Sequence, residues 1–233
     1  MRNIVFNMAH MHRHGSAFYD FLRLRKSFFV DQLGWDIPHD DEVEMDQYDN
    51  PTAWYSLVLR DGEVVGGGRA MPSTARWGEH TYMMRDVALG KLSSIPSEIV
   101  MEAEATPRTW ECTRVVVSDE LSTAVERSRC LSMLAEGVLG VAARHGAAEI
   151  MCLSRVSLMR ALRQLGLPCE RRGGSYVEPA DGHSYTMLSM PVRSGHDAVT
   201  SRLAARAPAG MPLGAPQHTH LSQPVPLHAP PVA

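Results

Sequence analysis

Residues 110–117 read Trp-Glu-Cys-Thr-Arg-Val-Val-Val and decide the fold of this chain of 233 residues. The tryptophan, threonine and valines favour a β-strand, yet the stretch also carries Glu111 and Arg114. Charged side chains are kept out of a core unless they are paired or used. Because side chains alternate between the two faces of a strand, these two residues face opposite sides unless a bulge intervenes.

Two interpretations of Glu111 and Arg114 are open. The first is a structural ion pair, with Asp46 or Asp49 and Arg69 as partners from other segments. The second is a functional site, because an acidic segment and Arg25 supply complementary charges elsewhere in the chain. The ionic and aromatic residue types together suggest a small zwitterionic, partly cationic ligand.

Periodicity outward from this strand predicts alternating helices and strands. The expected elements are a helix over 16–33, a hairpin of strands over 54–59 and 63–70, the strand over 110–117, a long helix over 121–145, a strand over 149–153, a helix over 156–165 and a strand over 185–191. This order predicts an α/β fold with a mixed, twisted central sheet and helices on both faces.

Local signals refine three of these boundaries. Ser16 is the expected N-cap of the first helix, and Gly34 is expected to end it. Residues 36–50 hold seven carboxylates and no lysine or arginine, so we expect a loop there. The glycines at 66–68 weaken the second strand of the hairpin and allow something to approach its backbone closely.

Composition excludes several classes of function. The hydrophobic content of 44% is enough for a full core. The 23 basic and 26 acidic residues give a net charge of -3, so the chain has no global attraction for nucleic acid or an anionic membrane, and a charged partner requires a local patch. No apolar stretch is long enough for a membrane span. The four cysteines, Cys112, Cys130, Cys152 and Cys169, lack metal-type spacing and are expected to be reduced. We therefore expect a cytoplasmic protein.

The composition changes near residue 194. From there the chain is rich in proline and histidine, has no aromatic residue and has one acid, Asp197. We expect one domain over residues 1–193 and a disordered tail over 194–233. His10, His12 and His14 lack a fourth partner, and we expect no metal.

Five strings along the chain resemble one family. They are Arg25-x-x-x-Phe29, Leu33-Gly34-Trp35, Glu44-x-Asp46-x-x-Asp49, Gly68-Arg69-x-x-Pro72-x-Thr74 and Trp110-Glu111-x-Thr113-Arg114. In this order and at this spacing, they resemble the acyl-homoserine-lactone synthases of LuxI type. The resemblance covers about residues 5–191.

The resemblance implies a fold like that of the GNAT N-acyltransferases, with a sheet split to form an acyl tunnel. It implies that the α-amine of S-adenosylmethionine attacks an acyl thioester and that its carboxylate then displaces methylthioadenosine to close the lactone, a quorum-sensing signal. S-adenosylmethionine is a substrate here, so no cofactor is expected. The acyl donor is acyl-acyl carrier protein or acyl-CoA.

Carried onto this chain, the resemblance also implies roles for individual residues. Glu111 and Arg114 are expected on the catalytic strand, with Glu111 acting as general base, directly or through water, or only orienting Arg114. The residues expected to order an N-terminal lid and to bind S-adenosylmethionine, together with Arg114, are Arg25, Phe29, Trp35, Asp46, Asp49 and Arg69. The chain departs from the family at Ala88, where a phenylalanine is usual; Tyr82 or Trp77 are candidate replacements.

Acyl-chain selection is expected from the later strand and helix. The candidate residues are Met151, Leu153, Met159 and Leu162, with Met101 and residues 115–117, while Cys152 and Ser154 are placed to act on a 3-oxo or 3-hydroxy group. The arginine-rich segment 121–172 offers a docking face for an acidic carrier, with Arg155 and Arg160 as its candidates. Two other functions stay open: an N-acyltransferase for another amine, and a non-catalytic relative that binds S-adenosylmethionine or carrier protein.

Overall fold

The computed structural model describes residues 1–100 and 105–205. In chain order its elements are β1 (Arg2–Asn7), the 3-10 helix η1 (Met8–His14), α1 (Ala17–Arg25), the π-helix η2 (Lys26–Gln32), β2 (Trp54–Arg60), β3 (Glu63–Pro72), α2 (Met83–Ala88), η3 (Ser97–Ile99), β4 (Thr109–Val117), α3 (Ala124–Arg144), β5 (Glu149–Arg155), α4 (Val156–Gln164), β6 (Glu170–Val177), β7 (Ser184–Pro191) and α5 (Val192–Ala205).

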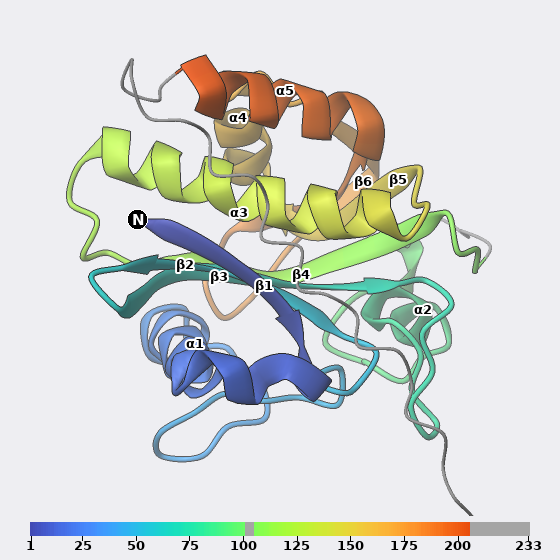
Figure 1. Ribbon diagram of the computed structural model, residues 1–233. Coiled ribbons are helices and arrows are strands. Elements are labelled where there is room, and N and C mark those ends of the chain that lie inside the picture. Colours follow the sequence, from blue (N-terminus) through green and yellow to red (C-terminus); the bar gives the residue numbers. More distant parts are fainter. Residues whose placement is uncertain (101–104, 206–233) are drawn as a thin grey trace, which may run out of the picture.

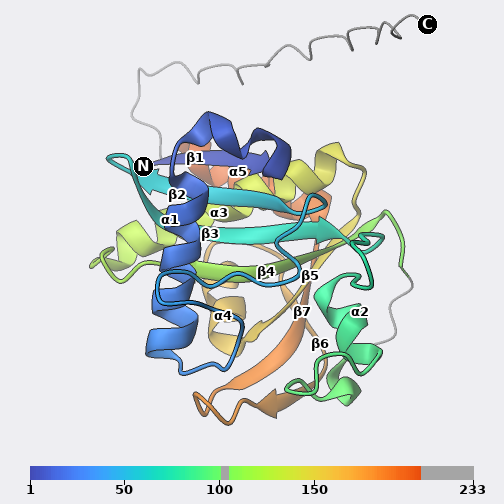
Figure 2. The same ribbon diagram turned by 90° about the horizontal axis from the view of Figure 1, so that it is seen from below.

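One seven-stranded sheet organises the chain, with the strand order β1-β2-β3-β4-β5-β7-β6. Every neighbouring pair is antiparallel except β4 and β5, which are parallel. Their pairing covers only the three positions from Thr109 with Glu149 to Glu111 with Met151. Both strands continue beyond that point, and Figure 2 shows them diverging. The sheet is therefore split in its middle.

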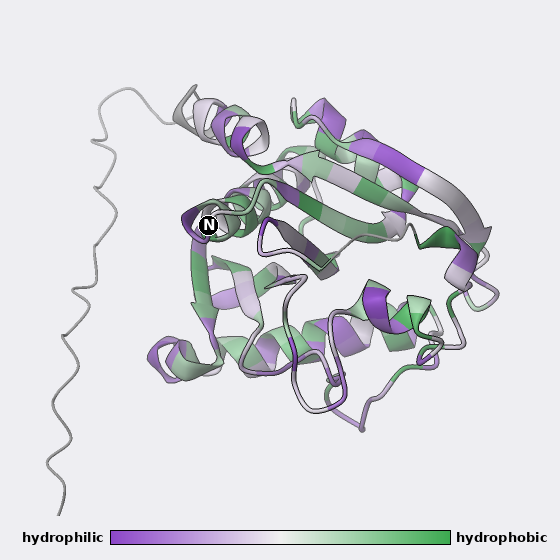
Figure 3. Ribbon diagram, turned by 90° about the vertical axis from the view of Figure 1, so that its right-hand side faces the viewer, coloured by the Kyte–Doolittle hydropathy of each residue, from purple (hydrophilic) through white to green (hydrophobic). Residues whose placement is uncertain are grey.

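Helices cover both faces of the sheet, as the sequence predicts (Figure 1). On one face lies α3, with α5 packed against it and α4 beside β5 and β7; α1 lies on the opposite face, against β3 and β4. A hydrophobic core fills each interface. Figure 3 shows hydrophobic residues recurring along the strands and on the helices. The mixed α/β architecture is confirmed.

The glycines of β3 allow this double coverage. A Cβ atom at Gly66 would lie 2.5 Å from the Cys130 sulfur of α3, and one at Gly67 would lie 2.5 Å from the Phe21 ring of α1. The close approach predicted from the sequence is confirmed, and the groups that approach are the helices themselves.

The first helix differs from its prediction. It begins at Ala17, so Ser16 occupies the predicted N-cap position, but its hydroxyl donates to the Asp20 carboxylate at 2.7 Å and makes no capping bond to the backbone. From Lys26 the chain continues as a π-helix, which widens the last turns before Gly34, whose φ of 68° ends the segment. Periodicity gave the length of the segment but not this change of helix type.

The predicted disorder from residue 194 is wrong for residues 194–205. They belong to α5, which packs on α3 and buries Val199 completely. A Cβ at Gly195 would lie 3.3 Å from Leu139, so this glycine lets the two helices approach. The rest of the predicted tail, residues 206–233, lies outside the described residues.

Two strands, β1 and β6, and three short helices, η1, α2 and η3, were also not predicted from the sequence. β1 alternates buried Ile4 and Phe6 with less buried residues and adds the edge beside β2. In the described part of the chain, no helix has the length and apolar character that a membrane crossing requires.

Candidate active site

A bulge in β4 sets the direction of Arg114. Between its pairings with β3, Gly67 with Val116 and Arg69 with Thr113, β4 contains one more residue than β3. Arg114 has a φ of 55°, in the left-handed region that costs a non-glycine residue about 1 kcal/mol or more. The bulge on which the sequence argument depended is therefore present. It brings the Arg114 guanidinium to the acidic loop that follows Trp35.

Six charged side chains form a closed ring at this point, here called the ionic ring. In order of contact they are Arg25, Glu44, Arg114, Asp46, Arg69 and Asp49. The nitrogen–oxygen distances around the ring, ending with Asp49 to Arg25, are 2.6, 3.1, 2.9, 2.5, 2.9 and 2.8 Å. Three guanidinium groups balance three carboxylates, and no member exposes more than 9% of its side chain.

The ionic ring ties the acidic loop to three elements. Arg25 comes from α1, Arg69 from β3 and Arg114 from β4, while all three carboxylates come from the loop. Burial alone would raise the pKa of the Asp46 carboxyl, but Arg69 and Arg114 outweigh it and hold that pKa below its usual range. Paired in this way, the buried charges fix the loop against the sheet.

Glu111 lies outside the ionic ring. Its carboxylate is 1% exposed and accepts backbone N–H bonds from Met83 at 2.8 Å and Met84 at 2.9 Å, at the start of α2. Burial raises the pKa of Glu111 to about 7, although these two bonds act in the opposite direction. Arg114 pairs with Glu44 and Asp46. No direct contact between Glu111 and Arg114 therefore supports the prediction that Glu111 orients Arg114.

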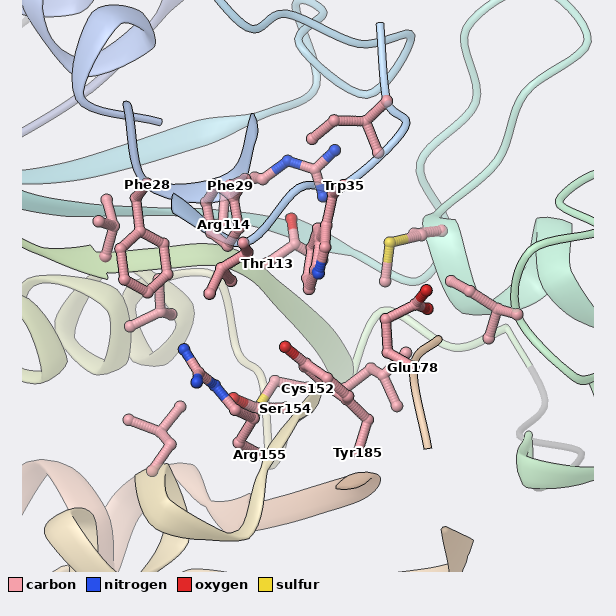
Figure 4. Close-up of a pocket in the computed structure, with 18 of the residues that line it drawn as sticks. Phe28, Phe29, Trp35, Thr113, Arg114, Cys152, Ser154, Arg155, Glu178 and Tyr185 are labelled. Atoms are coloured by element: carbon pink, nitrogen blue, oxygen red, sulfur yellow. The ribbon is translucent and has the colours of Figure 1, made fainter. Parts of the chain in front are cut away.

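The split between β4 and β5 opens into a cavity of about 770 Å³. Phe28, Phe29 and Trp35 form part of its wall, with Thr113 and Arg114 of β4 and Cys152, Ser154 and Arg155 of β5 (Figure 4). Further apolar lining comes from Val115, Val117, Leu131, Leu158 and Ala161. The cavity therefore has a wall backed by the ionic ring and an apolar wall, within the usual size range of ligand sites.

The predicted binding residues divide into two groups. Phe29, Trp35, Asp46 and Arg114 line the cavity. Arg25, Asp49 and Arg69 lie behind it as members of the ionic ring, and Glu111 is also absent from the lining. Glu44, which the sequence motif contains, is fully buried and bridges Arg25 to Arg114.

The predicted acyl-pocket residues lie in different places, and their role in acyl selection stays a prediction. Leu153 lines the cavity, as do residues 115–117, Cys152 and Ser154. Met151, Met159 and Leu162 are not on the wall: Met151 packs in the core on the α1 side, and the other two pack in the core on the α3 side. The rotation of α4 instead presents Leu158 and Ala161 to the cavity. Met101 lies outside the described residues.

The two candidate docking arginines have different surroundings. Arg155 lines the cavity, with its guanidinium 5.8 Å from the centre of the Phe28 ring. Arg160 is exposed on α4. Their role in docking a carrier stays a prediction.

An aspartate that the sequence did not single out joins two distant walls of the cavity. The Trp35 indole N–H donates to Asp181 at 3.1 Å, and the Tyr185 hydroxyl donates to the same oxygen at 2.6 Å. Asp181 lies between β6 and β7, next to Pro179 and Ala180 of the lining. Asp181 lies in a turn, and no sequence pattern there indicates a contact with Trp35, which is 146 positions away.

Ala88 is exposed at the end of α2 and does not line the cavity. Of its candidate replacements, Tyr82 is 2% exposed and Trp77 is 53% exposed. The histidines at 10, 12 and 14 lie on η1. Within residues 1–100 and 105–205, no group of three or more His, Cys, Asp or Glu side chains is arranged to hold a metal ion.

Comparison with solved structures shows that other proteins share this fold. An acyl-CoA N-acyltransferase from Pseudomonas aeruginosa has the same fold with a TM-score of 0.51 at 14% identity, covering 81% of this chain and 97% of its own. The chain thus has the α/β fold of the GNAT-like type. The autoinducer synthase family model matches residues 9–180, and the chain belongs to this family.

Individual relatives share most of the chain. An acyl-homoserine-lactone synthase of Aliivibrio fischeri is 27% identical over 173 residues, 73% of this chain and 84% of that protein. The structure of BjaI, a CoA-dependent acyl-homoserine lactone synthase, with SAM and isopentyl-CoA, matches with a TM-score of 0.68 at 17% identity, covering 87% of this chain and 89% of BjaI.

Proposed function

We propose that this protein makes an N-acyl-homoserine lactone from S-adenosylmethionine and an acyl thioester. The observation that carries the proposal is the cavity in the split between β4 and β5, which joins a wall backed by charges to an apolar wall. A polar amino-acid substrate and an acyl chain need these two environments side by side. Family membership and the ligands of BjaI support the same activity.

The first step forms an amide. The neutral α-amine of S-adenosylmethionine attacks the thioester carbonyl, and the thiol of the carrier leaves. Glu111 takes up the proton of the amine, because a carboxylate whose pKa burial raises to about 7 is half ionised near neutral pH and is basic enough to accept it. Since Glu111 is not part of the cavity lining, we assign the transfer to an intervening water.

The second step closes the lactone. The substrate's own carboxylate attacks the carbon that bears the sulfonium, and neutral methylthioadenosine leaves with the electron pair of the broken carbon–sulfur bond. The protein's part in this step is to hold the bent substrate. We assign this role to the wall that contains Phe29, Trp35 and Arg114, which the ionic ring supports from behind.

S-adenosylmethionine is consumed as a substrate, and we propose no cofactor. The acyl donor is bound through its thioester, with either a carrier protein or coenzyme A as the leaving thiol. We place the reaction in the cytoplasm. The four cysteines are unpaired, which suits a reducing compartment.

Mass spectrometry of a reaction with purified protein tests the proposal. With S-adenosylmethionine and a mixture of acyl thioesters of different chain length, we expect methylthioadenosine and an acylated homoserine lactone in equal amounts. Acylated product without methylthioadenosine would indicate transfer to another amine. Release of neither product, where a known synthase releases both, would refute the activity.

A further inference from the structure

The cavity contains charges that the ionic ring does not neutralise. Six charged residues line it: Asp36, Asp46, Arg114, Arg127, Arg155 and Glu178. Asp46 and Arg114 pair within the ring, and Arg127 pairs with Asp119 at 3.2 Å. For Asp36, Arg155 and Glu178, no described residue of opposite charge lies within ion-pair distance. Three lining charges are therefore available to a ligand.

These three charges are segregated by sign. Arg155 immediately precedes α4 and stacks on Phe28, whereas Glu178 follows β6. Figure 4 shows Phe28 and Glu178 at opposite sides of the cavity, with Trp35 and Tyr185 drawn between them. Asp36 directly follows Trp35 and is exposed. Glu178 thus places a negative charge on the side of the cavity opposite Phe28.

A continuous aromatic wall leads to Glu178. The rings of Phe29 and Trp35 lie 5.0 Å apart, those of Trp35 and Tyr185 5.6 Å, and those of Tyr185 and Tyr176 5.9 Å. The polar contacts of the Glu178 carboxylate within the described chain are a hydrogen bond with Tyr176 and one from the Ala180 backbone N–H at 3.3 Å. Both neighbours are uncharged, so neither competes as a cation for this carboxylate.

Aromatic faces attract cations, including those that carry no hydrogen-bond donor, and an unpaired carboxylate adds the attraction of its charge. The sulfonium of S-adenosylmethionine is such a group. We propose that Glu178 recognises the sulfonium and thereby distinguishes the cationic substrate from the neutral thioether, methylthioadenosine, that the reaction releases. This inference rests on the proposed function.

The assignment has a consequence for turnover. When the carbon–sulfur bond breaks, the positive charge that Glu178 attracts disappears, while the adenine and ribose remain unchanged. The attraction to the nucleoside then weakens at the moment when it must leave. A partly exposed ion pair of this kind contributes a factor of about 2 to 5 in affinity.

Titration calorimetry of the full chain with S-adenosylmethionine and with methylthioadenosine tests the inference. Glu178→Gln keeps the shape of the side chain and removes its charge. We expect this variant to bind S-adenosylmethionine about 2 to 5 times more weakly and methylthioadenosine with unchanged affinity. Glu63→Gln, in the exposed turn at the start of β3, removes the same charge away from the cavity and is expected to leave both affinities unchanged.

Each other outcome contradicts a defined statement. Glu178 does not recognise the positive charge of the sulfonium if Glu178→Gln binds S-adenosylmethionine as tightly as the wild type does. The same conclusion follows if the variant loses affinity for both ligands equally. If the wild-type protein binds neither ligand, the proposed function itself fails, and the role of Glu178 fails with it. A loss of S-adenosylmethionine affinity in Glu63→Gln of the same size would show a general charge effect and would also overturn the inference.

Discussion

Arg114 donates to the carboxylate of Glu44, 70 residues earlier in the chain, and not to Glu111 on its own strand. The bulge at Arg114 and the burial of Glu44 make this contact possible. The two charges of β4 therefore have separate tasks. Arg114 holds the acidic loop against the sheet. The Glu111 carboxylate forms no ion pair with Arg114.

Removing Arg114 should destabilise the fold. Arg114→Met leaves two buried carboxylates, Glu44 and Asp46, each with one partner fewer, and we expect the free energy of unfolding to fall by about 3 to 5 kcal/mol. Urea denaturation followed by circular dichroism measures it. Arg127→Met is the matched control, since its ion pair with Asp119 is exposed and should cost less than about 1 kcal/mol. Similar losses in both variants would contradict the role of the ionic ring.

Protonation of Glu111 should make kcat fall on the acidic side of the pH–rate profile, here called the acidic limb. Below pH 7 the carboxyl becomes protonated and no longer accepts the proton of the amine, so kcat should fall about tenfold per pH unit there. Glu111→Gln should lower kcat by a factor of about 10² to 10⁴ and remove this limb, with a smaller change in substrate binding. A pH profile of Glu111→Gln that keeps the wild-type limb would assign the titration to another group.

The same carboxyl should make stability depend on pH. Its folded-state pKa of about 7 lies above its ordinary value of 4.5, so the protonated form is favoured by folding. That contribution is fully present below pH 4.5 and is lost as the pH rises to 7, a decrease of about 3 kcal/mol. Thermal or urea unfolding between pH 4.5 and 8 measures it, and Glu111→Gln should show a correspondingly flatter profile.

Filling the apolar wall should shorten the acyl chain of the product. Ala161 lines the cavity from α4, and Ala161→Leu places three additional carbon atoms there. In competition between acyl thioesters, we expect the products to shift to shorter chains, as mass spectrometry would show. Met159→Leu, on the same helix but not on the wall, should leave the distribution unchanged. The reverse pattern would support the original sequence assignment of Met159.

The side chain of Val199 should contribute to stability although it lies beyond the domain boundary that composition suggested. Val199→Ala removes two methyl carbons from a fully buried position, and we expect a loss of about 2 kcal/mol in the free energy of unfolding. Thr200→Ala, its exposed neighbour, should change the stability by no more than about 0.5 kcal/mol. Equal effects would mean that α5 is not docked in solution.

The sequence was sufficient where a local pattern determined a local structure. The hairpin of β2 and β3 has a tight turn between two apolar runs, and α3 lies within the range 121–145 that apolar residues at helical spacing predict. The α5 helix was missed because prolines and histidines after it dominated the composition, although Val192 and Val199 are spaced to bury one face.

The site was predictable as a set of residues but not as a set of contacts. The motif strings contain every member of the ionic ring, yet the partner of each arginine depends on the bulge at Arg114 and on the path of the acidic loop. The composition of the apolar wall depends on how far α4 is rotated about its axis. This rotation places Ala161, and not Leu162, on the cavity surface. The path of a loop and the rotation of a helix cannot be predicted from the spacing of residues along the chain.

The closed form of the ionic ring also restricts which substitutions its six positions can accept during evolution. Each of its six members serves two neighbours, so changing one charge leaves two buried groups short of a partner. A ring of this kind is expected to be inherited whole, or to be replaced by coordinated substitutions at adjacent members. Among homologous chains, changes at Arg25, Glu44 and Arg114 should therefore be correlated with one another.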